Sequence, residues 1–115
     1  MNNLHERALT AAQIFVKKHG YKLLDEPEEF FDMAMVDYIE DEDVLVLVKV
    51  YEDKDEMPHE TPRRKDCEVY AAKYLVNNID SGHNLVGMGL RFDTISFHVL
   101  DDDKALLAHH INCLG

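Results

Sequence analysis

The sequence is poor in cysteine, in basic residues and in long apolar runs, and each shortage excludes a class of protein. The two cysteines, Cys67 and Cys113, fit neither a disulfide framework nor the spacing of a zinc site, so we expect reduced core thiols in a cytoplasmic protein. No apolar run reaches the roughly 18 to 20 residues that a membrane-spanning helix needs. The N-terminus also lacks the basic-then-apolar layout of a secretion signal, and we expect no membrane association.

Basic residues are outnumbered by acidic ones, with 12 Lys and Arg against 23 Asp and Glu and a net charge of −11. The imbalance is concentrated in residues 25–60, which hold fifteen acids and only Lys49 and Lys54. A long acidic surface repels phosphate backbones, so we expect nucleic-acid binding to be absent or weak. The simplest role of this segment is a solubilising acidic face.

The pattern of apolar residues predicts one α/β domain over residues 1–115. Helical spacing predicts two helices, and runs rich in apolar residues between turn signals predict five strands. The order α-β-β-β-α-β-β gives a mixed five-stranded sheet with helices packed on it. The expected helices are residues 3–20 and 63–79, and the expected strands are residues 21–24, 30–39, 44–51, 85–100 and 105–114.

The third expected strand, "VLVLVKVY" at 44–51, is apolar on both of its sides except for Lys49. A strand with two apolar sides belongs in the centre of a sheet that is covered on both faces. We therefore expect it to lie between two neighbouring strands. The lysine within it needs a specific explanation.

Four stretches of the sequence resemble the YraN-like family of small bacterial proteins. They are "AAQIFVKKHGYKLL" for the first helix and strand, "RRKDCEVYAAKYL" for the second helix, "RFDTISF", which is similar to R-F-D-V-V-A-V, and "HHINCL", which is similar to H-I-x-N-A-F. The resemblance covers nearly the whole chain and implies a restriction endonuclease-like fold. It also implies a nuclease site in which acids on G-E-I-D and V-E-V-K bind Mg²⁺.

The sequence departs from the family where that site is expected. V-E-V-K falls on residues 48–51, so Lys49 replaces the metal-binding glutamate and Tyr51 replaces the lysine. E-I-D falls on residues 32–34, which keeps Asp32 but puts Ala34 in place of the aspartate. The resemblance therefore implies a degenerate site at Asp32, Ala34, Lys49 and Tyr51, without a cofactor. The glutamate of the family's first helix falls near Leu9 or Thr10, neither of which is acidic.

Two alternatives remain open at this site. Lys49 either forms an ion pair with Asp32 or Asp37 on the neighbouring strand, or extends its stem along the sheet so that its ammonium reaches water. A metal site rebuilt from relocated acids would use Asp32, Asp37 and Glu52.

Arg63, Arg64 and Lys65 at the start of the second helix are candidate anion-binding residues, because backbone amides at a helix start also attract anions. The alternative is a solvated patch that pairs with nearby acids.

Two functions follow from these observations. The first is a non-catalytic domain that binds another protein or a second copy of itself, with its nuclease site lost. The second is a divergent Mg²⁺-dependent endonuclease that acts on DNA through relocated acids. The loss of site residues and the charge of −11 favour the first, so we do not expect an enzyme.

Overall fold

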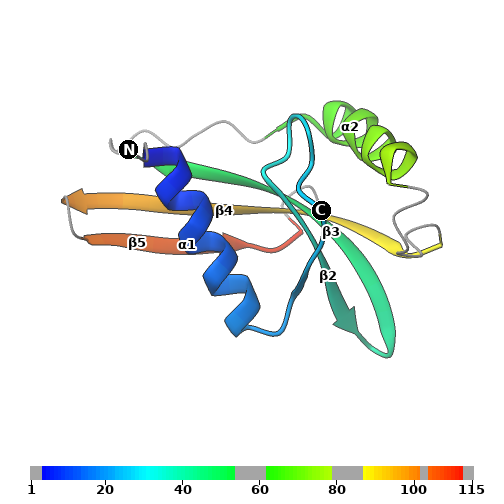
Figure 1. Ribbon diagram of the computed structural model, residues 1–115, viewed down its shortest axis with the longest axis horizontal. Helices are drawn as coiled ribbons and strands as arrows, with labels where there is room; N and C mark the ends of the chain where they lie inside the picture. The colour runs from blue at the N-terminus through cyan, green and yellow to red at the C-terminus, as the bar shows by residue number, and fades with distance from the viewer. Residues whose placement is uncertain (1–3, 54–61, 79–86, 102–103, 113–115) are drawn as a thin grey trace.

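Two helices lie against opposite faces of one five-stranded sheet (Figure 1). The computed structural model describes residues 4–53, 62–78, 87–101 and 104–112. The element order and the α/β class agree with the prediction from sequence. The elements are α1 (Leu4–Lys18), β1 (Lys22–Leu23), β2 (Met33–Ile39), β3 (Glu42–Asp53), α2 (Arg64–Asn77), β4 (Gly89–Asp101) and β5 (Lys104–His110).

The strands lie in the order β1-β2-β3-β4-β5, so each is next to its neighbour in sequence. Every pair is antiparallel except β3 and β4, which are parallel and are connected through α2. The central position of β3, between β2 and β4, confirms what its two apolar sides predicted.

Alternation along β3 divides the core into two layers. Val46, Val48 and Val50 point to the side that α1 covers, which we call the α1 face. Leu45 and Leu47 point to the opposite side, the α2 face. All five are at most 3% exposed, so β3 is buried on both faces as predicted.

Most boundaries shift by a few residues from those predicted, and two of the shifts lie at β2 and its hairpin with β3. The β2–β3 turn needs only Glu40 and Asp41, whose φ angles of 50° and 66° give the tight left-handed turn that suits a hairpin. The two acids after them therefore belong to β3. The expected strand start at Phe30 is wrong, because Phe30 has a φ of 68° and β2 begins only at Met33. Within the described residues, neither helix is long and apolar enough to cross a membrane.

Candidate functional site

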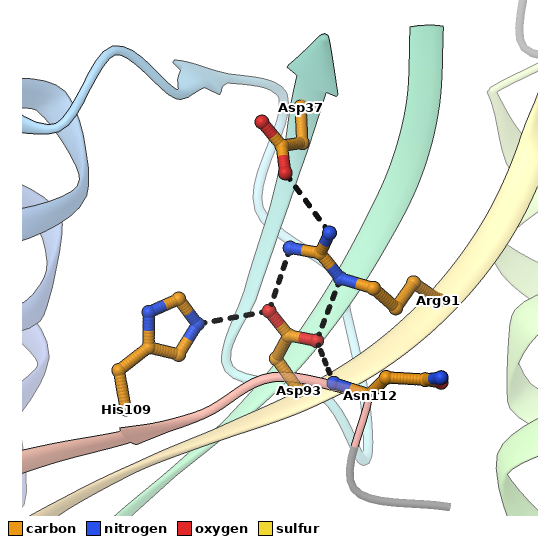
Figure 2. A network of polar contacts seen from close by, with 5 residues as sticks. All are labelled: Asp37, Arg91, Asp93, His109 and Asn112. Atoms are coloured by element: carbon orange, nitrogen blue, oxygen red, sulfur yellow. Dashed lines mark hydrogen bonds and ion pairs between the residues drawn. The ribbon is translucent and has the colours of Figure 1, made fainter. Parts of the chain in front are cut away.

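A buried network of charges centres on Asp93, on the α1 face of β4 (Figure 2). The Arg91 guanidinium donates to both carboxylate oxygens of Asp93, through Nε and Nη2 at 2.9 Å each. Its Nη1 reaches Asp37 on β2, also at 2.9 Å. His109 Nε2 lies 2.8 Å from Asp93, and the backbone N–H of Asn112 donates to Asp93 at 2.8 Å. We call these five residues the Asp93 network.

Strand register explains how residues so far apart in the sequence meet. Arg91 and Asp93 are two positions apart on β4, so their side chains share a face. His109 on β5 is opposite Ile95, the next residue of β4 on that face. Asn112 then adopts a φ of 55°, a left-handed conformation that asparagine tolerates, and its N–H points to Asp93.

The network keeps a fully buried carboxylate charged. The Asp93 side chain is 0% exposed, and burial alone would raise its pKa. The hydrogen bonds from His109, Arg91 and Asn112 outweigh burial, and the pKa of Asp93 is lowered. Burial likewise opposes the charge on Arg91, but Asp93 and Asp37 raise its pKa above the usual value. The arrangement is a set of mutually compensating charges that connects β2, β4 and the end of β5.

Most of this network comes from two of the four stretches on which the expected resemblance to the YraN-like family rests. Arg91 and Asp93 are the charged residues of "RFD", while His109 and Asn112 are the first and fourth residues of "HHINCL". In this chain the two motifs therefore bond to each other and fasten β5 to β4. The one acid that they contain, Asp93, is bonded to Arg91, His109 and Asn112.

A second cluster joins the start of α1 to the sheet. His5 lies between two carboxylates, with Nε2 3.0 Å from Asp32 and Nδ1 3.0 Å from Glu52. The other oxygen of Asp32 accepts the backbone N–H of Val50 at 2.7 Å. Asp32 precedes β2 and Glu52 is near the end of β3, so one imidazole connects three elements. We call this cluster the His5 bridge.

The two carboxylates favour the protonated form of His5. The hydrogen bond to Glu52 raises its pKa most, and Asp32 adds to the increase, although partial burial opposes both. The charges of Asp32 and Glu52 are then compensated by an imidazolium. Each ring nitrogen of His5 contacts a different carboxylate, so the imidazole ring lies between Asp32 and Glu52.

The His5 bridge predicts a pH dependence of stability. Because the folded pKa of His5 is raised above 6.5, its contribution is complete below about pH 6.5 and is lost as the pH rises through the folded value. The melting temperature of the wild type should therefore exceed that of His5→Gln by up to about 4 °C at pH 5.5, since a part-exposed ion pair contributes about 1 kcal/mol at most. The difference should shrink towards pH 9.

The control for this measurement is His110→Gln, because His110 is exposed at the end of β5. Its melting temperature should follow the wild type at every pH. A gap between wild type and His5→Gln that stays constant or widens as the pH rises would show that protonation of His5 does not hold the bridge together.

Lys49 does not form the ion pair with Asp32 or Asp37 that was one of its two expected arrangements. Its ammonium donates to the backbone carbonyl of Phe30 at 3.2 Å and lies 4.0 Å from the centre of the Phe30 ring. The turn at Phe30, where φ is positive, places the ring and the carbonyl over the α2 face beside Lys49. The expected acids are instead bound to His5 and Arg91.

The remaining positions of the degenerate site share the α2 face, as strand alternation implies. Ala34 is opposite Leu47, and Lys49 and Tyr51 follow Leu47 at intervals of two. Ala34 is only 1% exposed and packs in the core beneath α2, while Lys49 and Tyr51 are half-buried. Leu9 of α1 packs against the opposite face. The positions aligned with the family's site are therefore divided between the two faces of the sheet.

The anion-binding candidates lie apart from both clusters. Arg63, Arg64 and Lys65 are exposed at the N-terminal end of α2. Arg63 occupies the N-cap position of α2, but its side chain does not form a hydrogen bond to the helix. Asp66 lies in the first turn of the same helix. The exposure of all three basic side chains fits the alternative of a solvated surface patch.

The structure thus brings together two of the three relocated acids. Asp32 and Glu52 meet at His5, whereas Asp37 belongs to the Asp93 network. His5 was not predicted as a site residue, because nothing in the local sequence marks a histidine whose partners are 27 and 47 residues away. Arg91 and Asp93 did carry a signal, namely opposite charges two apart within an apolar strand. Over the described ranges, no group of three His, Cys, Asp or Glu is arranged to hold a metal ion.

Comparison of the sequence with models of known protein families gave no match, and comparison with curated proteins gave none either.

Proposed function

We propose that this chain is a non-catalytic domain with a nuclease-like arrangement of elements, and that it acts by binding another protein. One observation carries the proposal: each acid that could form a relocated metal site already has a partner within the chain. Asp32 and Glu52 are held by His5, and Asp37 is held by Arg91.

These partners compete directly with a metal ion. Mg²⁺ requires near-octahedral oxygen ligands at about 2.1 Å, so two carboxylates must converge on one point. Asp32 and Glu52 bind opposite nitrogens of one ring, each at 3.0 Å, and so face an imidazole that occupies the space between them. A metal ion there would have to displace the His5 imidazole from both carboxylates.

The positions aligned with the family's site support the same function. Ala34 contributes no oxygen ligand and is covered by α2. Lys49 adds a positive charge, which would repel Mg²⁺, and its ammonium is already bound to the Phe30 carbonyl. Neither position offers a ligand that could compensate for the acids engaged elsewhere.

A divergent Mg²⁺-dependent endonuclease is the second candidate, and one observation favours it. Asp32 and Glu52 come from neighbouring segments of the sheet and face the same imidazole. Glu52 is also followed two positions later by Lys54, which is the E-x-K spacing of such enzymes. In that case His5 would have to leave the carboxylates before a metal ion could bind.

Incubation with DNA tests the proposal. Supercoiled plasmid and labelled duplex, junction and single-stranded oligonucleotides should remain intact with 10 mM Mg²⁺ or 1 mM Mn²⁺ at pH 7.0 and 8.5. The higher pH matters because it favours neutral His5 and so weakens the bridge. Cleavage that requires metal and disappears in Glu52→Gln, while persisting in the exposed-site variant Glu68→Gln, would overturn the proposal in favour of the endonuclease.

A further inference from the structure

The hairpin formed by β2 and β3 extends past both helices (Figure 1). Tyr38 on β2 and Leu90 on β4 lie on either side of β3, and both belong to the α2 face by alternation from Ala34 and Phe92. Their side chains are 65% and 45% exposed, although Leu45, the register partner of Leu90 on β3, is only 2% exposed. The cover that α2 gives to this face therefore ends before the hairpin does.

Residues 40–43 are all acidic, and they form the turn of the hairpin and the first two residues of β3. All four are exposed, and none of them forms an ion pair with another described residue. Asp41 accepts a hydrogen bond from the Tyr38 hydroxyl at 3.2 Å, which does not compensate its charge. We call residues 38–43 and Leu90 the hairpin tip.

The cations nearest to the hairpin tip do not neutralise it. Among the described residues on the α2 face, strand register places Lys22 closest, opposite Val36, so one positive charge lies near four negative ones. Arg91 lies on the other face and is held within the Asp93 network. Lys17 and Lys18 end α1, which also covers the other face. Since the screening length is about 8 Å at physiological ionic strength, the hairpin tip keeps a negative potential of its own.

The turn itself is made of residues that do not suit its backbone best. Glu40 and Asp41 both have a positive φ, at 50° and 66°. Asparagine followed by glycine is the preferred pair for a two-residue hairpin turn of this kind, and glutamate is disfavoured in the left-handed region. The sequence therefore places two mutually repelling carboxylates where neutral residues would give a more stable hairpin. Such a departure from local preference, with no compensating contact in the chain, is expected at a functional surface.

We propose that the hairpin tip binds a basic segment of another protein, in which arginine or lysine side chains flank an apolar centre. The basic side chains contact the carboxylates of residues 40–43. The apolar centre covers the part of the α2 face that α2 leaves open, at Tyr38 and Leu90. An arginine of the segment can also stack on the Tyr38 ring. The same negative charge repels the phosphates of nucleic acids.

This partner class deepens the proposed binding function and so rests on it, but the two are tested separately. The cleavage assay reports on Asp32 and Glu52, whereas binding of a basic peptide reports on the hairpin tip. Intact DNA together with no peptide binding would remove this inference alone. Metal-dependent cleavage together with peptide binding would remove the non-catalytic function alone.

Fluorescence anisotropy with a synthetic probe tests the inference. The probe is a labelled peptide with arginines at both ends and a short run of leucine and valine between them. We expect saturable binding to the wild type, weakened about tenfold or more in Glu40→Asn with Asp41→Gly, a change that corresponds to about 1.4 kcal/mol. The matched control is Glu26→Gln with Glu28→Gln, which removes the same charge from exposed positions outside the hairpin tip and should change the affinity by no more than about twofold.

The melting temperature separates binding from folding in this experiment. Glu40→Asn with Asp41→Gly gives the turn its preferred residues and removes two repelling charges, so this variant should melt above the wild type. A loss of binding in a more stable protein cannot come from unfolding. Tyr38→Ser tests the apolar contact and should weaken binding about fivefold, because Tyr38 is exposed on the α2 face.

Amide chemical shifts in ¹⁵N-labelled protein identify the site, and saturating probe should move those of residues 38–43 and Leu90. The inference is overturned if the probe does not bind saturably, if glutamines in place of its arginines leave the affinity unchanged, or if the control variant loses as much affinity as the turn variant. It is also overturned if Tyr38→Ser binds like the wild type and spermine competes as well as the probe, because the hairpin tip would then attract any cation. A dimer that the turn variant dissociates would assign the surface to a second copy of the chain instead.

Discussion

Arg91→Met is expected to lower the melting temperature by about 12 to 20 °C at pH 7. The substitution keeps most of the volume of the side chain but removes both hydrogen bonds to Asp93 and the one to Asp37. Asp93 is 0% exposed, so it would retain a charge in the core with only His109 and one N–H to compensate it. Removing one partner of a buried ion pair costs about 3 to 5 kcal/mol, which corresponds to that shift for a domain of this size.

The effect should also depend on pH in a particular direction. In the wild type the lowered pKa of Asp93 contributes stability above its unfolded value, and this contribution is lost as the pH falls. Without Arg91 the carboxyl group is more easily protonated, so the gap between variant and wild type should narrow towards pH 4. Calorimetry between pH 4 and 8 measures both quantities. Arg63→Met, at an exposed arginine, should change the melting temperature by no more than about 2 °C.

A loss of less than about 1 kcal/mol in Arg91→Met, or a gap that does not change with pH, would contradict the buried network. In that case the guanidinium would be no more than a surface contact, and "RFD" would require another explanation.

Ala34→Asp is expected to lose about 4 kcal/mol or more of stability, which approaches the total stability of many small domains. Ala34 is 1% exposed and packs with Leu47, Cys67 and Ala71 beneath α2. A carboxyl group there loses its hydration and gains no partner, so its pKa should rise and the core should open. The substitution introduces the aspartate that the expected resemblance to the YraN-like family would place at this position.

Urea denaturation followed by circular dichroism measures this loss. The matched control is Ala72→Asp, one residue beyond Ala71 on α2 and exposed to solvent, which should cost no more than about 0.7 kcal/mol of helix propensity. If Ala34→Asp were as stable as Ala72→Asp, Ala34 would not lie in the core. The positions aligned with the nuclease site could then converge on a metal ion.

The fold could be predicted from local patterns because these patterns report burial directly. The two apolar sides of residues 44–51 placed β3 at the centre of the sheet, and its neighbours and its cover on both faces agree. The start of β2 was wrong by three residues, because the apolar pair Phe30 and Phe31 continues the pattern of a strand while the backbone turns at Phe30. Apolar character alone does not reveal a positive φ.

The candidate site could be predicted only in part, because it depends on which residues face each other across strands. Asp32 and Glu52 were identified as acids, but their meeting at His5 depends on the placement of α1 over the sheet. Lys49 was recognised as unusual, yet its partners are a carbonyl and a ring rather than a carboxylate. Every residue has a backbone carbonyl, so the sequence does not show which one Lys49 contacts. Asp37 was predicted to be one of the relocated metal ligands. In the structure its partner is Arg91, whose side chain extends from β4 across β3 to β2.

The proposal that the acids are engaged within the chain, and not available to a metal ion, is tested most directly by NMR with Mn²⁺. One equivalent of Mn²⁺ is added to ¹⁵N-labelled protein at pH 7, and the broadening of each amide signal is measured. The account predicts no selective broadening around Asp32, Val50 and Glu52, where His5 holds both carboxylates. Strong broadening confined to these amides, reversed by EDTA and absent from Asp32→Asn, would contradict it.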